Sequence, residues 1–271
     1  MCRLAAWSKL KPQSEDLMWL QASNGGDGDG FIYVTGDLDV KAENAKENAI
    51  EYVDGLTIAR FMPSTQKTAY KSKKSGIVEY FTWPEEIEYI QLPQSAFYHT
   101  RIRSSGAYGI MHTHPAISGN ILVMQNGTER VFEIEGMADF QGVAYLINIG
   151  YIKPEALKFL THSNWFIVNT ATHKFWIISA KSFDPLWMHE LSDEEWIIAS
   201  EAIRDEMREF LGVIKGRITE DMTFKIENAD ITYVEKKNVE KYYGYYGYNS
   251  TVNNSNYTKY LYDDYQAWES F

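Results

Sequence analysis

The chain has 271 residues, of which 45% are hydrophobic and 23% charged, with a formal net charge of −11. This is the composition of a globular protein, and its acidic balance argues against a surface that neutralises nucleic-acid phosphates. No apolar run reaches the roughly 18 to 20 residues of a membrane helix, and the first 25 residues show no signal-peptide pattern. A single cysteine excludes an internal disulfide framework and fits a reducing compartment, so we expect a soluble, cytoplasmic protein that binds neither nucleic acid nor membrane.

The first third of the chain shows one clear strand signal. Residues 31–35 form a β-rich run bounded by glycines, which predicts a buried strand, and residues 23–30 before it predict a turn-rich loop. From residue 37 to 53, charges alternate with Ala and Ile at helical spacing, which favours an exposed amphipathic helix over a solvated insertion. The basic run at residues 67–74 is typical of a solvated loop.

The middle of the chain predicts strands, then a helix, then strands again. Short β-rich runs occupy residues 96–131, the clearest at 121–124, and a helix is expected around residues 140–149. Two strands at 165–169 and 174–179 follow, joined by a short turn. This order favours a layered α+β domain over a strictly alternating parallel sheet.

The last 90 residues differ in character from the rest. A capping-box pattern at 192–195 precedes an apolar stripe that runs to residue 211, which predicts a helix of about 20 residues. Alternation at 222–227 and 231–234 then predicts a pair of strands. Residues 242–271 are rich in Tyr, Asn and Gly, and two interpretations stay open: disorder in isolation, or a peptide that orders on a partner or mediates self-assembly.

Cys2, the only cysteine, becomes the N-terminal residue once the initiator methionine is removed, which its small side chain normally permits. The freed α-amine has a reference pKa near 8 and can accept the thiol proton directly or through a water. Nucleophile and base then belong to one residue. Taken alone this is a weak signal, because many chains carry a cysteine near their start.

Three later motifs, in order, strengthen the signal: HTRIRSSG at 99–106, His114-Pro115, and ILVMQNG at 121–127. Together with Cys2 they resemble the class II glutamine amidotransferases of the N-terminal-nucleophile (Ntn) hydrolase superfamily, and the opening Met-Cys-Arg is most similar to stand-alone members. DGDGF at 27–31 also resembles a strand start of that family. The resemblance covers residue 2 to about 182, with 37–90 poorly matched. It implies an αββα sandwich of two antiparallel sheets over residues 1–182, followed by a helix-and-strand extension at 183–241.

The resemblance implies a reaction for Cys2. The thiol attacks the side-chain amide carbon of glutamine, releases ammonia and leaves a thioester, which water hydrolyses. The family stabilises the oxyanion with an Asn side-chain amide and the next backbone N–H, which correspond to Asn126 and Gly127. The same two residues, at the end of an apolar strand, are in their own right a strong hairpin-turn signal.

The resemblance also implies how the amino-acid end of glutamine is held. Arg101 corresponds to the Arg that binds the carboxylate, and Ser104 and Ser105 fall where neighbouring contacts occur. Asp139 aligns with the Asp that binds the ammonium group. Two positions depart from the family pattern: Gln125 replaces the usual His before Asn-Gly, and Ser105 stands where many members have His. Without its motif, Arg101 would be an ordinary surface ion-pair residue.

No cofactor is expected, and no metal. His112 and His114 would lie on one face of a strand, as in some metal sites, but the sequence offers no third ligand, so His114-Pro115 is expected to shape the pocket wall. Ammonia would escape to solvent or pass to a separate partner protein. The alternative is a catalytically silent Ntn-fold protein that acts in assembly through its surface and its Tyr-rich tail.

Overall fold

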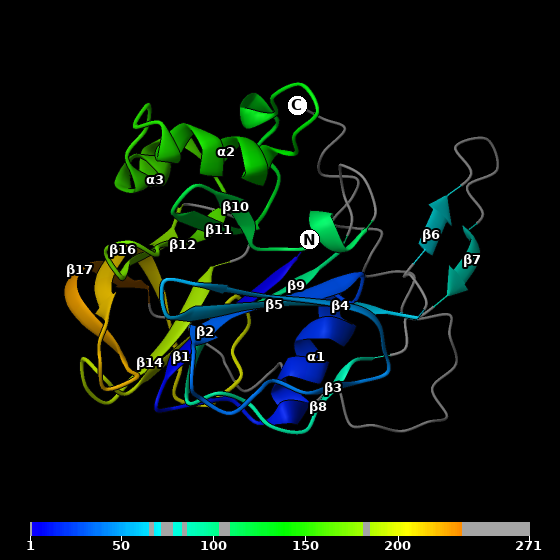
Figure 1. Cartoon of the computed structure of the whole chain (residues 1–271), viewed down its shortest axis with the longest axis horizontal. Coiled ribbons are helices and arrows are strands. Elements are labelled where there is room, and N and C mark those ends of the chain that lie inside the picture. The colour runs from blue at the N-terminus through cyan, green and yellow to red at the C-terminus, as the bar shows by residue number, and fades with distance from the viewer. Residues whose placement is uncertain are drawn as a thin grey trace. The chain divides into compact units, whose positions relative to one another are not determined.

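The computed structural model describes residues 2–64, 68–71, 78–82, 86–102, 109–180 and 185–234 (Figure 1). Its α-helices are α1 (Ser14–Asn24), α2 (Asp139–Asn148) and α3 (Leu157–Leu160), and its 3₁₀ helices are η1 (Ile110–His112), η2 (Arg130–Phe132) and η3 (Pro154–Ala156). The strands are β1 (Arg3–Ser8), β2 (Gly28–Val34), β3 (Ala42–Glu43), β4 (Ala45–Val53), β5 (Leu56–Pro63), β6 (Thr68–Lys71), β7 (Val78–Thr82), β8 (Glu88–Tyr89), β9 (Ser95–Arg101), β10 (Ala116–Ser118), β11 (Ile121–Asn126), β12 (Asn164–Asn169), β13 (Lys174–Ser179), β14 (Leu186–Glu190), β15 (Trp196–Ala199), β16 (Arg208–Ile218) and β17 (Phe224–Val234).

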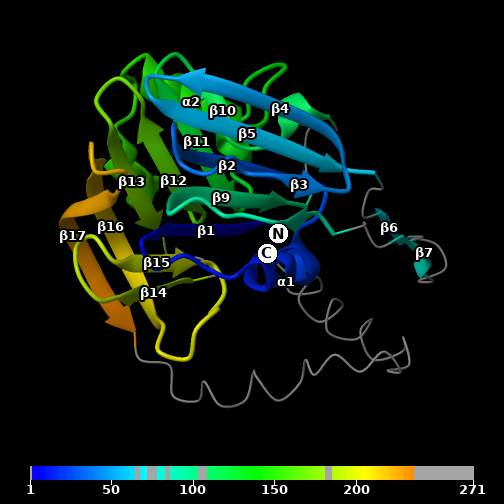
Figure 2. The same cartoon turned by 60° about the horizontal axis from the view of Figure 1, so that its bottom comes forward.

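Within these ranges, a 13-stranded antiparallel sheet runs in the order β10-β11-β12-β13-β16-β14-β15-β1-β9-β2-β5-β4, with β17 on the other edge of β16. The sheet folds over so that its two halves face each other (Figure 2). The packing shows this directly, because one apolar cluster combines side chains from both halves, among them Leu4, Phe97, Leu122, Phe166 and Ile214. Two short pairs, β3 with β8 and β6 with β7, lie outside this sheet.

Helices cover the outer faces of the two halves. Leu17 and Leu20 of α1 pack with Trp7 and Phe31 on the outside of the β1–β9–β2–β5 half. On the other half, α2 and α3 cover β10 to β13 through a third cluster that includes Val143, Leu157 and Trp165. The layers are therefore helix, sheet, sheet and helix, which confirms the predicted α+β sandwich of two stacked antiparallel sheets.

Several local predictions are confirmed. The strand expected at 31–35 overlaps β2 except for its last residue, that at 121–124 lies within β11, and the helix around 140–149 is α2. The strands expected at 165–169 and 174–179 are β12 and β13, an antiparallel pair joined by a short turn. In each case the sequence shows a short β-rich apolar run for a strand, or apolar residues at helical spacing for the helix, between clear turn signals.

The helix predicted at residues 37–53 is wrong, because this segment forms β3 and β4. β4 is the last strand of the sheet and pairs only with β5, so its side chains alternate between exposed and half-buried. Its charges suit an edge strand, which must resist pairing with other chains. Asp54 and Gly55 join β4 to β5 with φ of 49° and 82°, as a two-residue Asp-Gly hairpin turn.

The helix predicted from residue 192 to 211 is also wrong, and strands β15 and β16 occupy this stretch. β15 pairs with β1 on one edge and β14 on the other, and all four of its residues are buried. The sequence of a strand that is buried on both faces is a continuous apolar run. Hydrophobic periodicity does not distinguish such a run from the sequence of a buried helix. The supposed capping residue, Ser192, accepts backbone N–H bonds from Glu194 and Glu195 in a turn instead.

Two boundaries also differ from expectation. The loop predicted at 23–30 ends early, because β2 begins at Gly28. The two strands predicted at 222–227 and 231–234 are one strand, β17, paired with β16 along most of its length. The division of the chain at residue 182 stays a prediction, although β14 to β17 belong to the same sheet as β1. Residues 242–271 lie outside the described residues, as do residues 67 and 72–74 of the basic run.

Within the described residues, no helix combines the length and the apolar character that crossing a bilayer requires.

A buried carboxylate joins α1 to the sheet. Oδ2 of Asp29, on β2, accepts hydrogen bonds from Gln21 Nε2 at 2.6 Å, from the Tyr98 hydroxyl at 2.9 Å, and from the Tyr89 hydroxyl. Burial raises the pKa of Asp29 to about 6, although these donors act in the opposite direction. The folded protein therefore binds a proton at this position more tightly than the unfolded chain does.

The Asn substitution of Asp29 tests this group through the pH dependence of stability. Between the unfolded pKa near 4 and the folded pKa near 6, the unfolded chain loses its proton first, so stability falls as pH rises, by about 3 kcal/mol in total. Asp29→Asn does not titrate and should lack this decrease. Urea unfolding of both proteins at pH 4.5 and pH 7 measures the difference, and an identical pH dependence in the two would contradict the assignment.

Candidate active site

The inner faces of the facing half-sheets carry apolar rows that end in polar residues at one end of the sandwich. Side chains alternate between faces along a strand, so residues two apart share a face. Leu4 and Ala6 of β1, Phe97 of β9, and Leu122 and Met124 of β11 belong to the core between the sheets. Continued by two-residue steps, these rows reach Cys2 just before β1, His99 and Arg101 on β9, and Asn126 on β11.

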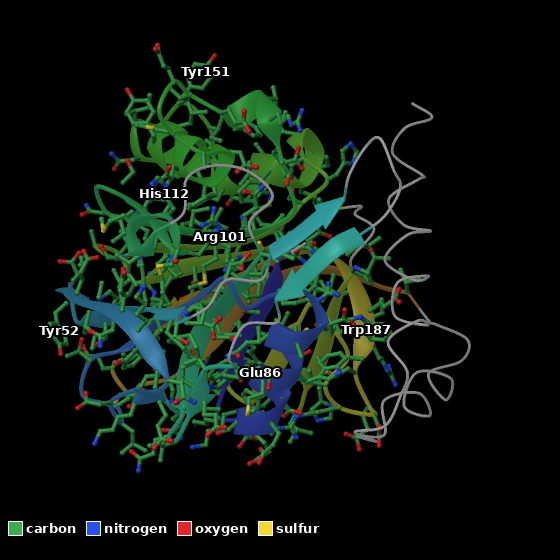
Figure 3. The ribbon with its side chains drawn as sticks, turned by 90° about the vertical axis from the view of Figure 1, so that its right-hand side faces the viewer. Tyr52, Glu86, Arg101, His112, Tyr151 and Trp187 are labelled. Atoms are coloured by element: carbon green, nitrogen blue, oxygen red, sulfur yellow. The ribbon has the colours of Figure 1, made fainter. Side chains whose placement is uncertain are left out.

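Strand pairing brings the ends of these rows together. In the β1–β9 ladder Leu4 lies opposite His99, so Cys2, just before β1, lies near the end of β9. His99 Nε2 is 2.9 Å from the backbone oxygen of Gln125, which links β9 to the end of β11. Figure 3 shows Arg101 in the interior, where it is buried, whereas Tyr151 is exposed at the surface.

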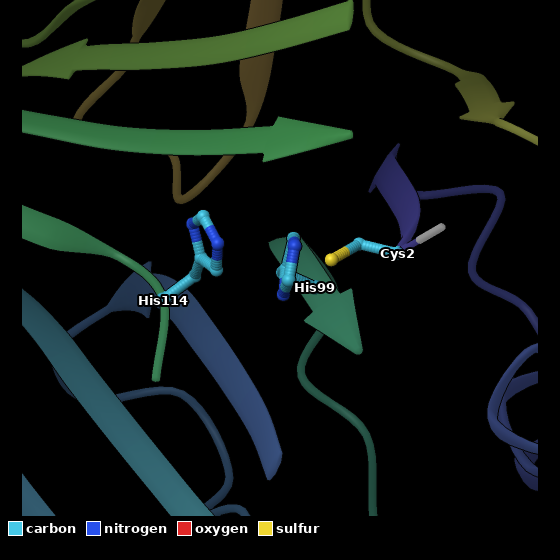
Figure 4. A group of neighbouring side chains, drawn as sticks. All are labelled: Cys2, His99 and His114. Atoms are coloured by element: carbon cyan, nitrogen blue, oxygen red, sulfur yellow. The ribbon is translucent and has the colours of Figure 1, made fainter. Parts of the chain in front are cut away.

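The thiol of Cys2 is buried and points toward His99 (Figure 4). Its Sγ lies 3.6 Å from the backbone oxygen of Ile102. Burial raises the pKa of the thiol, the charge of Arg101 acts in the opposite direction, and the carboxylate of Asp139 adds to the increase. The resting group is therefore the neutral thiol, which must lose its proton to a base before the sulfur can act as a nucleophile.

The two histidines beside Cys2 are uncharged. Burial lowers the pKa of His99 to about 3, and the charge of Arg101 contributes in the same direction. Burial likewise lowers the pKa of His114 well below its usual value, with further contributions from His99 and Arg101. Their rings stack with centroids 3.7 Å apart, and Phe140 packs against His114 at 3.9 Å.

Glycines on β2 make room for the segment that carries His114. A Cβ at Gly30 would lie 1.7 Å from the backbone oxygen of His114, and one at Gly28 would lie 2.6 Å from Thr113 Oγ1. Arg60, buried on β5, donates from Nη2 to the Pro115 backbone oxygen at 2.9 Å. The glycines of the DGDGF motif therefore serve close packing, a role for which sequence reasoning had no signal.

Asn126 is the last residue of β11 and Gly127 follows it, at the end of the sandwich where Cys2 lies. Asn126 is buried, and among the described residues its Nδ2 and Oδ1 have no hydrogen-bond partner. An amide in this state is free to donate to a substrate oxygen. Gly127 has φ of 137°, and an added Cβ would lie 2.1 Å from Ser163 Oγ, so no other residue fits without displacement.

Asp139 begins α2, and its carboxylate is tied into the loop that follows β11. Oδ2 accepts from Gln125 Nε2 at 3.1 Å and from the Glu129 backbone N–H at 2.6 Å, and Oδ1 accepts from the Phe140 N–H. Gln125 also donates to Ser163 Oγ at 3.3 Å. Gln125 therefore helps to orient the Asp139 carboxylate.

Of the remaining candidates from the sequence, two serines lie outside the described residues and two histidines do not share a strand face. Ser104 and Ser105 lie outside the described residues. His112 does not share a strand face with His114, because it ends the 3₁₀ helix η1. His114 instead joins His99 and Cys2, and one donor atom from each of these three lies within 4.8 Å of the others. The motif HTRIRSSG begins with His99, but the sequence predicts no role for this residue. Its two-residue spacing from Arg101 is the signal that could have assigned it to the site.

No protein-family profile and no curated protein matches this chain. Two solved structures are similar to it: a glutamine phosphoribosylpyrophosphate amidotransferase from B. subtilis complexed with ADP and GMP, and the allosteric regulatory enzyme of purine biosynthesis. Each is 15% identical over the aligned residues, with a TM-score of 0.49, and the alignments cover 84% of this chain and 49% of the other. The chain therefore spans about half the length of either structure.

Substitution of Gly127 by Ala should destabilise the protein more than the same change at Gly136. Both glycines have positive φ, at 137° and 80°, but a Cβ at Gly136 meets nothing within 4 Å, whereas one at Gly127 collides with Ser163. Gly136→Ala should cost about 1–2 kcal/mol of backbone strain, and Gly127→Ala should cost this strain and the collision. Urea unfolding measures both, and equal costs would contradict the close approach to Ser163.

Proposed function

We propose that this protein hydrolyses the side-chain amide of glutamine, or a related γ-glutamyl amide, with Cys2 as its nucleophile. The observation that carries the proposal is that the inner-face rows of β1, β9 and β11 end together in Cys2, Arg101 and Asn126. A thiol, a cation suited to a carboxylate and an unpartnered amide donor then lie at one end of the sandwich. These are the groups that acyl transfer from an amino-acid amide requires.

The base in this proposal is the α-amine of Cys2 after removal of Met1. His99 is the obvious alternative, but its pKa is about 3 whereas the thiol's ordinary value is 9.0 and burial raises it further. Moving the proton from the thiol to this ring would cost about 8 kcal/mol before the attraction between the resulting thiolate and imidazolium is counted. An α-amine, with a reference pKa near 8, is a far better match. Cysteine and base in one residue also explain why a buried thiol needs no charged histidine beside it.

The proposed substrate contacts follow the resemblance residue by residue. The amide nitrogen of Asn126 and the backbone N–H of Gly127 would stabilise the oxyanion, and Arg101 would bind the glutamine carboxylate with two parallel hydrogen bonds. Asp139 would bind the ammonium group, supported by its burial and by the bond from Gln125 that fixes its orientation. Ser104 and Ser105 would add neighbouring contacts.

The fate of the ammonia belongs to the same proposal. Ammonia released by Cys2 would either escape to solvent or be delivered to a separate protein that uses it. We propose residues 242–271, with their many tyrosines, as the segment that would bind such a partner or a second copy of the chain.

Replacing Cys2 by Ala should abolish glutaminase activity, because no other thiol exists in the chain. Ammonia and glutamate released from glutamine, and amine released from a γ-glutamyl anilide, are the products to measure. Equal activity of the wild-type and Cys2→Ala proteins would exclude the nucleophile assignment. Lack of activity in both would favour the catalytically silent assembly protein.

Intact-mass measurement of the wild-type protein is the control for this experiment. We expect a mass that lacks one methionine, since the proposed base is the α-amine of Cys2. A fully active protein that retains Met1 would exclude the amine as the base and leave only the thiol assignment standing.

Replacing Asn126 by Ala should lower kcat by about 10²–10³-fold with little effect on KM, because the lost donor acts on the oxyanion. Asn169→Ala is a matched control: Asn169 ends the same β11–β12 ladder at its other end, opposite Ile121, and its side chain accepts a bond from the Thr172 N–H. That variant should retain the wild-type kcat. A similar loss of kcat in both variants would indicate general damage to the ladder and contradict the role of Asn126.

A further inference from the structure

Three potential metal ligands from separate parts of the chain converge at the proposed nucleophile. Cys2 precedes β1, His99 lies on β9, and His114 lies just before β10; all three are buried. One donor atom of each lies within 4.8 Å of the others. Figure 4 shows the thiol directed toward His99 and the two rings side by side. A soft sulfur and two imidazole nitrogens form a donor set that zinc prefers.

The hydrogen bonds of the two rings leave the same nitrogen free in each. His99 uses Nε2 toward the Gln125 backbone oxygen at 2.9 Å. His114 hydrogen-bonds to the backbone of Val123, two residues earlier on β11, and its Nδ1 is without a partner, so the bond uses Nε2. Nδ1 of His99 is also buried and without a partner among the described residues. With Nε2–H donated to a carbonyl, each Nδ1 keeps a lone pair, the arrangement usual for histidines that bind metals.

The rings are also held in place by packing. His114 lies between the His99 ring and Phe140, at 3.7 and 3.9 Å, and its backbone rests against Gly30. These contacts keep the two imidazoles next to each other before any ligand arrives. The ring planes are 32° apart, so the rings must still turn for both Nδ1 lone pairs to meet at one ion.

We propose that Cys2, His99 and His114 bind one Zn²⁺-like divalent transition-metal ion through Sγ and two imidazole Nδ1 atoms. On binding, the S–H bond breaks, the proton leaves to solvent and the thiolate coordinates the metal, with no change of oxidation state. Tetrahedral zinc holds such ligands about 3.4 Å apart, so the three side chains must close by roughly 1 Å. The site would then have three protein ligands and one open position.

The α-amine of Cys2 fits that fourth position. In a protein without Met1, the amine and thiolate of an N-terminal cysteine close a five-membered chelate ring on the metal. The nearby Arg101 charge opposes a cation, whereas the thiolate and the Asp139 carboxylate favour it; both charges act on Cys2. The thiolate is therefore the ligand on which affinity should depend most.

Metal binding and amide hydrolysis use the same sulfur and the same amine. The metal site itself does not depend on the proposed function, but its consequence does: if Cys2 is the nucleophile, a bound ion inhibits the enzyme reversibly. The ion would also shield a reactive N-terminal thiol from oxidation. This would make metal availability a regulator of the activity.

Titration of the full-length, metal-stripped protein with Zn²⁺ by calorimetry tests the site, and substitution with Co²⁺ reports thiolate coordination by a charge-transfer band in the near ultraviolet. We expect one ion per chain. Cys2→Ala should remove the Co²⁺ band, and Cys2→Ala and His114→Gln should each weaken Zn²⁺ binding by more than about tenfold. No binding to the wild-type protein, or equal binding by either variant, would overturn the proposal.

Two histidine variants outside the cluster serve as controls. His173→Asn removes an imidazole at the β12–β13 turn, where φ of 53° suits Asn. His112→Asn removes the half-buried imidazole two residues before His114. Both should bind one Zn²⁺ with wild-type affinity. Loss of binding in His112→Asn with binding retained in His114→Gln would place the metal elsewhere and overturn the assignment. Circular dichroism of each variant checks that it is folded.

A glutaminase assay separates this inference from the proposed function. If both hold, stoichiometric Zn²⁺ abolishes the activity and a chelator restores it. Zinc binding at Cys2 without glutaminase activity in the metal-free protein would retain the metal site and reject the enzyme. Activity that persists with one Zn²⁺ bound would reject the shared use of Cys2.

Discussion

The pairing of β1 on both of its edges determines where the only cysteine of the chain lies. β9 pairs along one edge and β15 along the other, and every residue of β1 is buried. Cys2, immediately before this strand, is therefore placed by two backbone ladders and not by its own side-chain contacts. Because β15 comes from the last quarter of the described chain, the position of residue 2 depends on closure of the sheet by β14 to β16.

The stacking of the two half-sheets then determines which groups meet the thiol. Apolar side chains on the inner faces fill the space between the sheets, and at the end where Cys2 lies the same rows continue as His99, Arg101 and Asn126. A change of one residue in the register of β9 would turn His99 and Arg101 to the α1 side. Strand register, more than any single contact, therefore assembles the site.

Sequence reasoning predicted the parts of the fold whose signals are local. The β12–β13 hairpin and α2 were found because each has a clear period between turns. The stretch from Trp196 to Leu211 was assigned to a helix because an apolar run buried between two neighbouring strands has no period that identifies it. Edge strand β4 was missed for the opposite reason: its exposed charges resemble those of a solvated helix, and only pairing with β5 decides its structure.

For the site, the motifs supplied Cys2, Arg101, Asn126, Gly127 and Asp139 as candidates, whose roles stay predictions. The motif HTR already contained the spacing that places His99 and Arg101 on one face of β9. The contact of His114 with Gly30, and the bonds of both imidazoles to β11, join segments that are far apart in the sequence. No local pattern reports such contacts, so neither the metal-ligand cluster nor the purpose of the β2 glycines could be read from the chain.

Buried polar atoms without hydrogen-bond partners destabilise the site, and a bound ligand can offset this destabilisation. The amide of Asn126 and the Nδ1 atoms of His99 and His114 are buried without partners among the described residues, and each such group costs about 1–3 kcal/mol. A substrate carbonyl would satisfy the Asn126 donor, whereas a metal ion would satisfy the two imidazoles. Both ligands first require the buried thiol to lose its proton, which burial opposes. A substrate and a metal ion would therefore satisfy different unpaired groups but compete for one sulfur, and both would depend on deprotonation of Cys2.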